Sequence, residues 1–126
     1  ILKIILETVH TFLEEFSNLW NSERKGILYP KCLFEDQGHS SDYALKSFIK
    51  NIWNDVVCVC GIEMHRRCLS LAHNADFEQI DDVLLRSKLE ARNLLLGREL
   101  ILNSESIKNI SELTSLAVQF NERNIL

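Results

Sequence analysis

The sequence predicts an all-α fold over residues 1–126, organised as one helical segment. Apolar residues recur at steps of three and four through long stretches, which is the period of a helix with one buried face. Four glycines and one proline among 126 residues are few for a fold rich in β-turns. A composition of 46% hydrophobic and 25% charged residues is ordinary for a globular chain.

The first helix is expected over residues 1–20. Its apolar residues, spaced by threes and fours, are Ile1, Leu2, Ile5, Leu6, Val9, Phe12, Leu13, Phe16, Leu19 and Trp20. Residues 21–40 then break the pattern and indicate a loop, with a short apolar turn near Leu33 and Phe34. A loop of this length in a compact domain suggests a functional loop or one that contacts a partner.

A second helix is expected after Ser41 or Asp42, either of which can cap it. Its apolar residues continue past Trp53 to Leu71, and the low polarity predicts burial on more than one side. Gly61 in this helix indicates a close backbone approach or a bend. Trp20 and Trp53 lie in apolar stripes and are expected in the core.

Two more helices are expected near the end of the sequence. Start signals at Asp76 and Asp81 precede a helix from about residue 82 to 102. A last helix covers about 110–121, with Asn109 or Ser111 as its cap.

The charge and cysteine patterns limit the partners and the compartment. A net charge of −4 with mixed signs argues against nucleic acid or an anionic membrane as a partner. No apolar run is long enough for a transmembrane helix. Because Cys32, Cys58, Cys60 and Cys68 lie in helical or apolar surroundings, a disulfide framework is disfavoured and a reducing cytoplasm is expected.

Adjacent arginines, Arg66 and Arg67, lie inside the apolar second helix. Neighbouring helical residues differ by about 100°, but two long guanidinium groups can still converge on one oxygen-rich ligand. Residue type alone favours a surface pair bound to nearby acids such as Glu63. The low polarity around the arginines favours a ligand instead, because an unpaired charge is costly to bury.

Cysteines and histidines gather in the same region, which raises the question of a zinc-binding domain. The residues are Cys58, Cys60, His65, Cys68 and His73. Their spacing within a continuous helix is not that of a zinc knuckle, so small buried thiols are expected and no metal. A nucleophilic cysteine has no clearly placed base, and no catalytic residue is assigned.

The stretch GIEMHRRCLSLAHNADFEQI, residues 61–80, resembles a segment of S-methyl-5-thioribose kinases of the form G-x-[EK]-[ML]-x-R-R-x4-A-H-x2-D-x3-I. The matching residues are Gly61, Glu63, Met64, Arg66, Arg67, Ala72, His73, Asp76 and Ile80. EARNLLLGRELILNSESIKNISELTSLA, which starts at Glu90, resembles the next segment of those kinases. FLEEFSNLW and YPKCLF resemble the segments before it, so the resemblance covers most of the chain.

The resemblance implies a specific enzyme. These kinases phosphorylate the 1-hydroxyl of S-methyl-5-thioribose with ATP and Mg²⁺ in methionine salvage. Their two-lobed fold is similar to aminoglycoside phosphotransferases and protein kinases, and this chain matches the helical part of the C-terminal lobe. Carried over, Arg66 and Arg67 contact the methylthioribose or the phosphoryl group that moves onto it.

The departures from the family pattern are equally informative. The chain has no glycine-rich loop, nucleotide-binding lysine, H-G-D loop or D-x-E metal motif, so alone it is expected to be inactive and to hold neither ATP nor Mg²⁺. These parts belong to a missing N-terminal lobe, and packing against that lobe predicts exposed apolar side chains on the first two helices. The alternative is a non-catalytic helical interaction module; a homodimer is left open.

Overall fold

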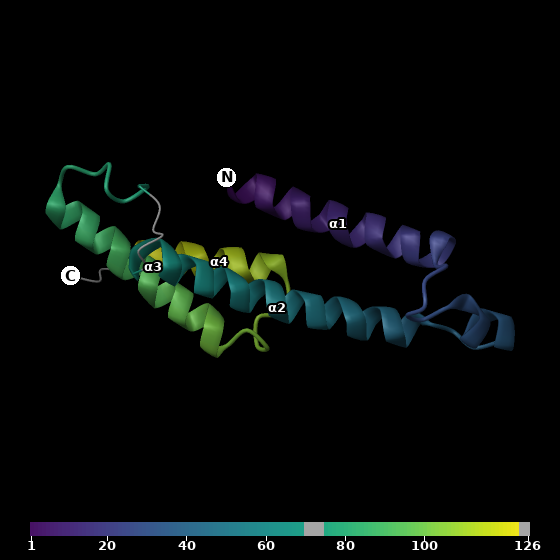
Figure 1. Cartoon of the computed structure of the whole chain (residues 1–126). Coiled ribbons are helices and arrows are strands. Elements are labelled where there is room, and N and C mark those ends of the chain that lie inside the picture. Colours follow the sequence, from purple (N-terminus) through teal and green to yellow (C-terminus); the bar gives the residue numbers. More distant parts are fainter. Residues whose placement is uncertain (70–74, 124–126) are drawn as a thin grey trace. The chain divides into compact units, whose positions relative to one another are not determined.

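The computed structural model describes residues 1–69 and 75–123, and these contain no β-strand, which confirms the all-α prediction. The elements are α1 (Leu2–Glu23), two short 3₁₀ helices η1 (Lys31–Leu33) and η2 (Glu35–Gln37), α2 (Asp42–Leu69), α3 (Val83–Leu102) and α4 (Ile110–Glu122) (Figure 1). None of these helices is both long and apolar enough to cross a lipid bilayer.

The chain divides into two compact units, Ile1–Ile52 and Trp53–Leu126, and α2 begins in the first and ends in the second. Unit 1 is organised around Trp20, the last apolar residue of the α1 stripe, which is 7% exposed. The ring centroids of Phe16 and Phe48 lie 5.7 Å apart and join α1 to the first turns of α2. Contact between aromatic rings therefore sets the packing of this helix pair.

The loop of unit 1 has more structure than the sequence indicated. The short turn expected near Leu33 and Phe34 is present as η1, and η2 follows at once. The N–H groups of Phe34 and Gly38 close these turns by donating to the carbonyl oxygens of Lys31 and Glu35. Gly38, at a φ of 75°, supplies the left-handed residue that ends η2.

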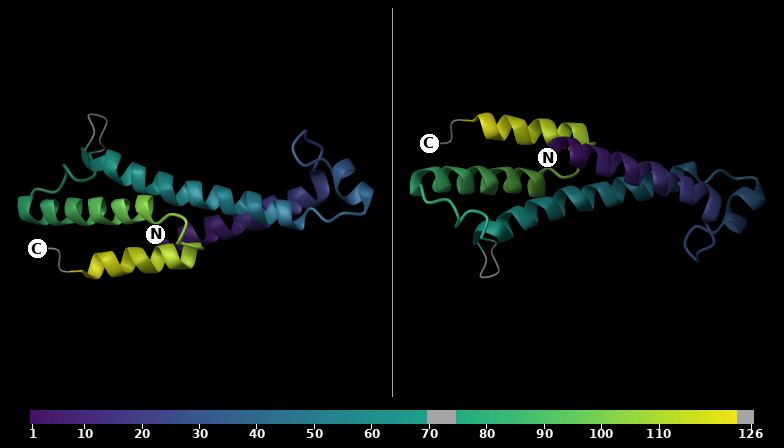
Figure 2. Two further views of the ribbon diagram at one scale, coloured as in Figure 1. Left: turned by 90° about the horizontal axis from the view of Figure 1, so that it is seen from below. Right: turned by 90° about the horizontal axis from the view of Figure 1, so that it is seen from above.

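Unit 2 packs α3, α4 and the second part of α2 around an aliphatic core. Val57 and Leu100 are 0% and 2% exposed, and Ile107 in the connection to α4 is buried against them. Figure 2 shows α3 and α4 side by side and antiparallel. Trp53 is half-buried against this core, and its indole N–H donates to the carbonyl oxygen of Ile107 at 2.7 Å.

Glycines let α2 and α3 approach closely. A Cβ at Gly61 would lie 2.5 Å from the Gly97 carbonyl oxygen, so only glycine fits there. Asn93 on α3 adds a polar link, because its Nδ2 donates to the Met64 carbonyl oxygen at 2.6 Å. The close approach expected at Gly61 is confirmed.

The observed helix caps differ in part from those that the sequence predicted. Asp82, rather than Asp76 or Asp81, caps α3 by accepting from the N–H groups of Leu84 and Leu85. Asn109, one of the two residues expected to do so, caps α4. The Ser41 hydroxyl, in contrast, is engaged by side chains of unit 1.

Exposed apolar side chains occur on the first two helices, as expected. Phe12 and Leu19 on α1, and Val59 and Ile62 on α2, are all exposed. The prediction that the α2 segment is buried on more than one side is wrong for these positions. Apolar residues can be buried, but how many of them are buried depends on how many elements pack against the helix.

Candidate functional site

The arginine pair lies in the last turn of α2, which ends at Leu69. The side chains of Arg66 and Arg67 are 37% and 45% exposed. Both guanidinium groups are thus held near the surface, within reach of solvent or of a bound molecule.

Arg66 forms the ion pair that its residue type suggested. Its Nε and Nη2 donate to one carboxylate oxygen of Glu63, at 2.9 and 2.7 Å. This hydrogen bonding holds the pKa of Glu63 below and the pKa of Arg66 above their ordinary values. Glu63 is therefore ionised at neutral pH and orients the guanidinium group of Arg66 along the helix.

Arg67 binds a different acid. Its Nη1 donates to Oδ2 of Asp76 at 2.6 Å, which ties the end of α2 to the segment before α3. Two residues of the kinase-like motif, Ala72 and His73, lie outside the described residues. The motif thus contains its own acidic partners, since Glu63 and Asp76 both belong to it.

Paired in this way, the four side chains carry no net charge. Guanidinium groups only donate hydrogen bonds and carboxylates only accept them, whereas a hydroxyl does both. Half-exposed arginine–carboxylate pairs therefore suit a polyhydroxylated, neutral molecule. An anionic group would also have to compete with Glu63 and Asp76 for the two cations.

His65 supports the helix contact. Its Nδ1 lies 2.8 Å from the carbonyl oxygen of Gly61 and therefore donates to it, which requires the tautomer with a proton on Nδ1. A Cβ at Gly97 would lie 2.8 Å from the same nitrogen, so the imidazole occupies the space that the second glycine leaves. The two glycines and His65 together set the distance between α2 and α3.

The cysteine and histidine cluster shows no metal-like arrangement in the part of the chain that is described, where no three His, Cys, Asp or Glu side chains could hold an ion. All four cysteines are free thiols, but Cys32 and Cys60 are exposed and Cys58 and Cys68 are half-buried, so the expectation of buried thiols is wrong. Cys68 accepts from Nδ2 of Asn93 at 3.2 Å, and desolvation raises the pKa of Cys60, which disfavours a reactive thiolate. His73 lies outside the described residues.

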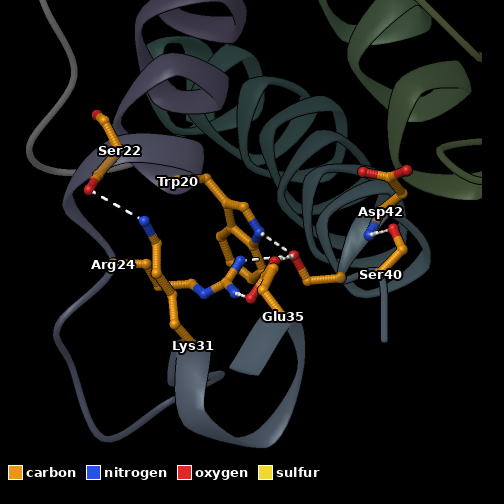
Figure 3. A network of polar contacts seen from close by, with 8 residues as sticks. Trp20, Ser22, Arg24, Lys31, Glu35, Ser40 and Asp42 are labelled. Atoms are coloured by element: carbon orange, nitrogen blue, oxygen red, sulfur yellow. Dashed lines mark hydrogen bonds and ion pairs between the residues drawn. The ribbon is translucent and has the colours of Figure 1, made fainter. Parts of the chain in front are cut away.

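Unit 1 contains a polar network that the sequence analysis did not identify (Figure 3). The guanidinium of Arg24, whose side chain is only 5% exposed, forms an ion pair with Glu35 and donates to the Ser41 hydroxyl at 2.6 Å. The indole N–H of Trp20 donates to the same hydroxyl at 3.1 Å, and the hydroxyl donates to Glu35 at 2.6 Å. Hydrogen bonding by Ser41 is the largest cause of the lowered pKa of Glu35, and a backbone hydrogen bond and then the charge of Arg24 lower that pKa further.

One signal in the sequence could have predicted part of this network. Arg24 follows Trp20 by four residues, the spacing that places two side chains on one helix face. The guanidinium carbon lies 5.0 Å from the Trp20 ring centroid and 5.5 Å from that of Phe34, within the range of cation–π contact. No local signal identified Glu35 or Ser41, because a tertiary fold of the loop brings them to Arg24.

Clefts occur in both units. A cleft of about 410 Å³ in unit 1 is walled by aromatic rings, including those of Trp20 and Tyr29. A cleft of about 510 Å³ in unit 2 lies between the end of α3 and the start of α4 and is lined by polar side chains such as Glu99 and Ser111. Neither arginine of the pair lines these clefts.

The chain is similar to bacterial proteins named methylthioribose kinase. It is 28% identical over 117 residues to the protein of Escherichia coli O45:K1, 32% over 112 residues to that of Klebsiella pneumoniae subsp. pneumoniae, and 33% over 105 residues to that of Yersinia enterocolitica. These matches cover 93%, 87% and 80% of this chain, but 28%, 25% and 26% of the respective relatives.

The chain thus spans about a quarter of the length of the curated relatives it matches. No protein-family model matches it. No solved structure matches it either. The resemblance inferred from the motif is confirmed by the similarity to these kinases over most of the chain.

Proposed function

Because the chain is related over most of its length to methylthioribose kinases, we propose that it is the helical C-terminal part of such an enzyme. The whole kinase would phosphorylate the 1-hydroxyl of S-methyl-5-thioribose with ATP, in the cytoplasm, as a step of methionine salvage. Its two-lobed fold would be kinase-like, with this chain in the C-terminal lobe. The observation that carries the proposal is the extended similarity, together with the motif that runs from Gly61 to Ile80.

Within this enzyme, Arg66 and Arg67 bind the sugar. The ion pairs with Glu63 and Asp76 support this role, because they offer donors and acceptors together, which is what hydroxyl groups require. The local charge balance favours the neutral thioribose over the transferred phosphoryl group as the ligand. The arginines then act by orienting the reacting hydroxyl, a contribution that matters because phosphoryl transfer depends mainly on positioning.

The catalytic base, the nucleotide site and the metal ligands belong to the rest of the kinase. In residues 1–69 and 75–123, no three acidic, histidine or cysteine side chains come together as a group that could hold a metal ion. The sequence also has none of the nucleotide-binding motifs. The chain by itself is therefore proposed to be inactive.

A chimeric kinase tests the proposal. The matched quarter of the Escherichia coli relative is replaced by this chain, and the folded chimera is assayed for ATP-dependent phosphorylation of methylthioribose at the 1-hydroxyl by phosphorus NMR. The proposal predicts product from the chimera and none from this chain alone. A folded chimera that forms no product contradicts it.

The competing proposal is a non-catalytic interaction module, which the absence of catalytic motifs supports. Exposed apolar side chains, among them Phe12, Val59 and Ile62, favour a piece of a larger enzyme, since a self-contained module is expected to bury more of them. An inactive but folded chimera would favour the module.

A further inference from the structure

The aromatic cleft of unit 1 has the properties of a small-molecule site. Its volume, about 410 Å³, lies within the range of ligand pockets. Its apolar walls are formed by Phe16, Leu19, Trp20, Leu28, Tyr29 and Phe48. These residues come from α1, the following loop and α2, so the cleft exists only in the folded unit.

The rings of the walls are arranged to accept another ring. The centroids of Trp20 and Tyr29 are 5.2 Å apart with planes inclined at 43°, and those of Tyr29 and Phe48 are 6.2 Å apart in an edge contact at 67°. Such offset and edge-on pairs leave ring faces and edges of opposite partial charge at the surface of the cleft. A planar aromatic ligand can pack against both.

The charged residues at the cleft are balanced by partners. Glu23 and Lys25 approach each other, with 3.7 Å between Oε2 and Nζ, and the guanidinium of Arg24 is bound by Glu35. A ligand with a net charge would lose water in this cleft without gaining an uncompensated opposite charge. The balance therefore favours a neutral ligand.

Tyr29 is held in an unfavourable backbone conformation. Its φ is 54°, in the left-handed region, which bulky residues rarely adopt. The strain persists while the side chain contacts Trp20, Phe34 and Phe48. Strained residues of this kind concentrate at binding sites, and here the strained backbone places a ring in the cleft wall.

We propose that this cleft binds a neutral, planar aromatic group of a small molecule. The inference goes beyond the proposed kinase function and is independent of it, because it depends on unit 1 and not on the arginine pair. The ligand is defined by shape and charge: one flat ring and no ionised group at neutral pH.

An NMR titration of the chain with benzyl alcohol tests the proposal. The indole N–H signal of Trp20, which lines the cleft, is expected to shift in a saturable way with a Kd on the order of 1 mM, as for a ligand of few atoms. The indole signal of Trp53, in unit 2, should not move. Cyclohexylmethanol, benzoate and benzylammonium serve as non-aromatic, anionic and cationic comparisons and are expected to bind at least tenfold more weakly.

Variants of Tyr29 separate binding from folding. Tyr29→Gly accepts the positive φ and removes the ring, so the loop is kept and affinity should fall tenfold or more. Tyr29→Phe should retain affinity within threefold. Leu33→Ala, at an exposed residue of η1 that does not line the cleft, should bind like the unchanged chain.

Several results would overturn the proposal. These are an unmoved Trp20 signal, equal affinity for cyclohexylmethanol, stronger binding of either charged probe, or unchanged affinity in Tyr29→Gly. Shifts of the Trp20 signal that depend on protein concentration without ligand would instead assign the cleft to contact between two copies of the chain.

Discussion

The two units of the chain are stabilised in different ways. In unit 2 the buried apolar residues are mostly aliphatic and come from different helices, with Val57 and Leu100 almost completely inaccessible. In unit 1 the one buried large apolar residue is Trp20, and its neighbours are other rings and a buried arginine. Unit 2 therefore depends on the volume of its core, whereas unit 1 depends on specific polar and aromatic geometry.

Truncation of the unit 2 core should have the largest effect on stability. Leu100→Ala removes most of a side chain that is 2% exposed, and a loss of about 3 kcal/mol in the free energy of unfolding is expected from lost transfer energy and the remaining cavity. Urea unfolding followed by the fluorescence of Trp53 measures it. Leu102→Ala, on an exposed position of the same helix, is the control and should change stability by less than about 0.5 kcal/mol.

An added methyl group at the helix contact should have a somewhat smaller effect. Gly61→Ala places a Cβ against the Gly97 carbonyl oxygen and should destabilise unit 2 by about 2 kcal/mol, despite alanine's better helix propensity. Gly26→Ala, which has open space around its Cβ, is the matched control. Equal unfolding midpoints in urea for the two variants would mean that α2 and α3 are not in close contact.

Acid should affect unit 1 through Glu35. Because its pKa is lowered in the folded chain, ionised Glu35 stabilises the fold at neutral pH, and this contribution is lost as the pH falls below about 4.3, through the lowered value. Glu35→Gln should remove that part of the acid dependence, which the fluorescence of Trp20 in a Trp53→Phe background can follow. Lys3 and Glu7 form an ion pair on α1 in which both side chains are largely exposed, so Glu7→Gln is the control for removal of a paired glutamate from unit 1.

The sequence allowed the helices of both units to be predicted, since the apolar period is local information. The cap residues were predicted less accurately than the helices. Asn109 was one of two residues expected to cap α4, but Asp82 accepts the N–H groups at the start of α3, where Asp76 and Asp81 were expected. Neighbouring aspartates have the same capping chemistry, and only the direction of the incoming chain selects one.

The candidate site was predictable in the same partial way. Spacing from Gly61 to Ile80 identified the arginine pair and the relation to the kinases, whereas the acid bound by Arg67 became evident only in the fold. The Arg24 network and the aromatic cleft could not be predicted, because Glu35, Ser41 and Tyr29 come together through the path of the loop.

The proposal that Arg66 and Arg67 bind the sugar is tested by the kcat/KM of the chimeric kinase for methylthioribose. Arg66→Ala or Arg67→Ala should each lower kcat/KM by about 100-fold, or roughly 3 kcal/mol. Arg86→Ala is the control, because Arg86 is also 37% exposed and paired with a glutamate on its own helix, and its kcat/KM should change less than about twofold. Near-unchanged kcat/KM for both Arg66→Ala and Arg67→Ala in an active chimera would contradict the claim.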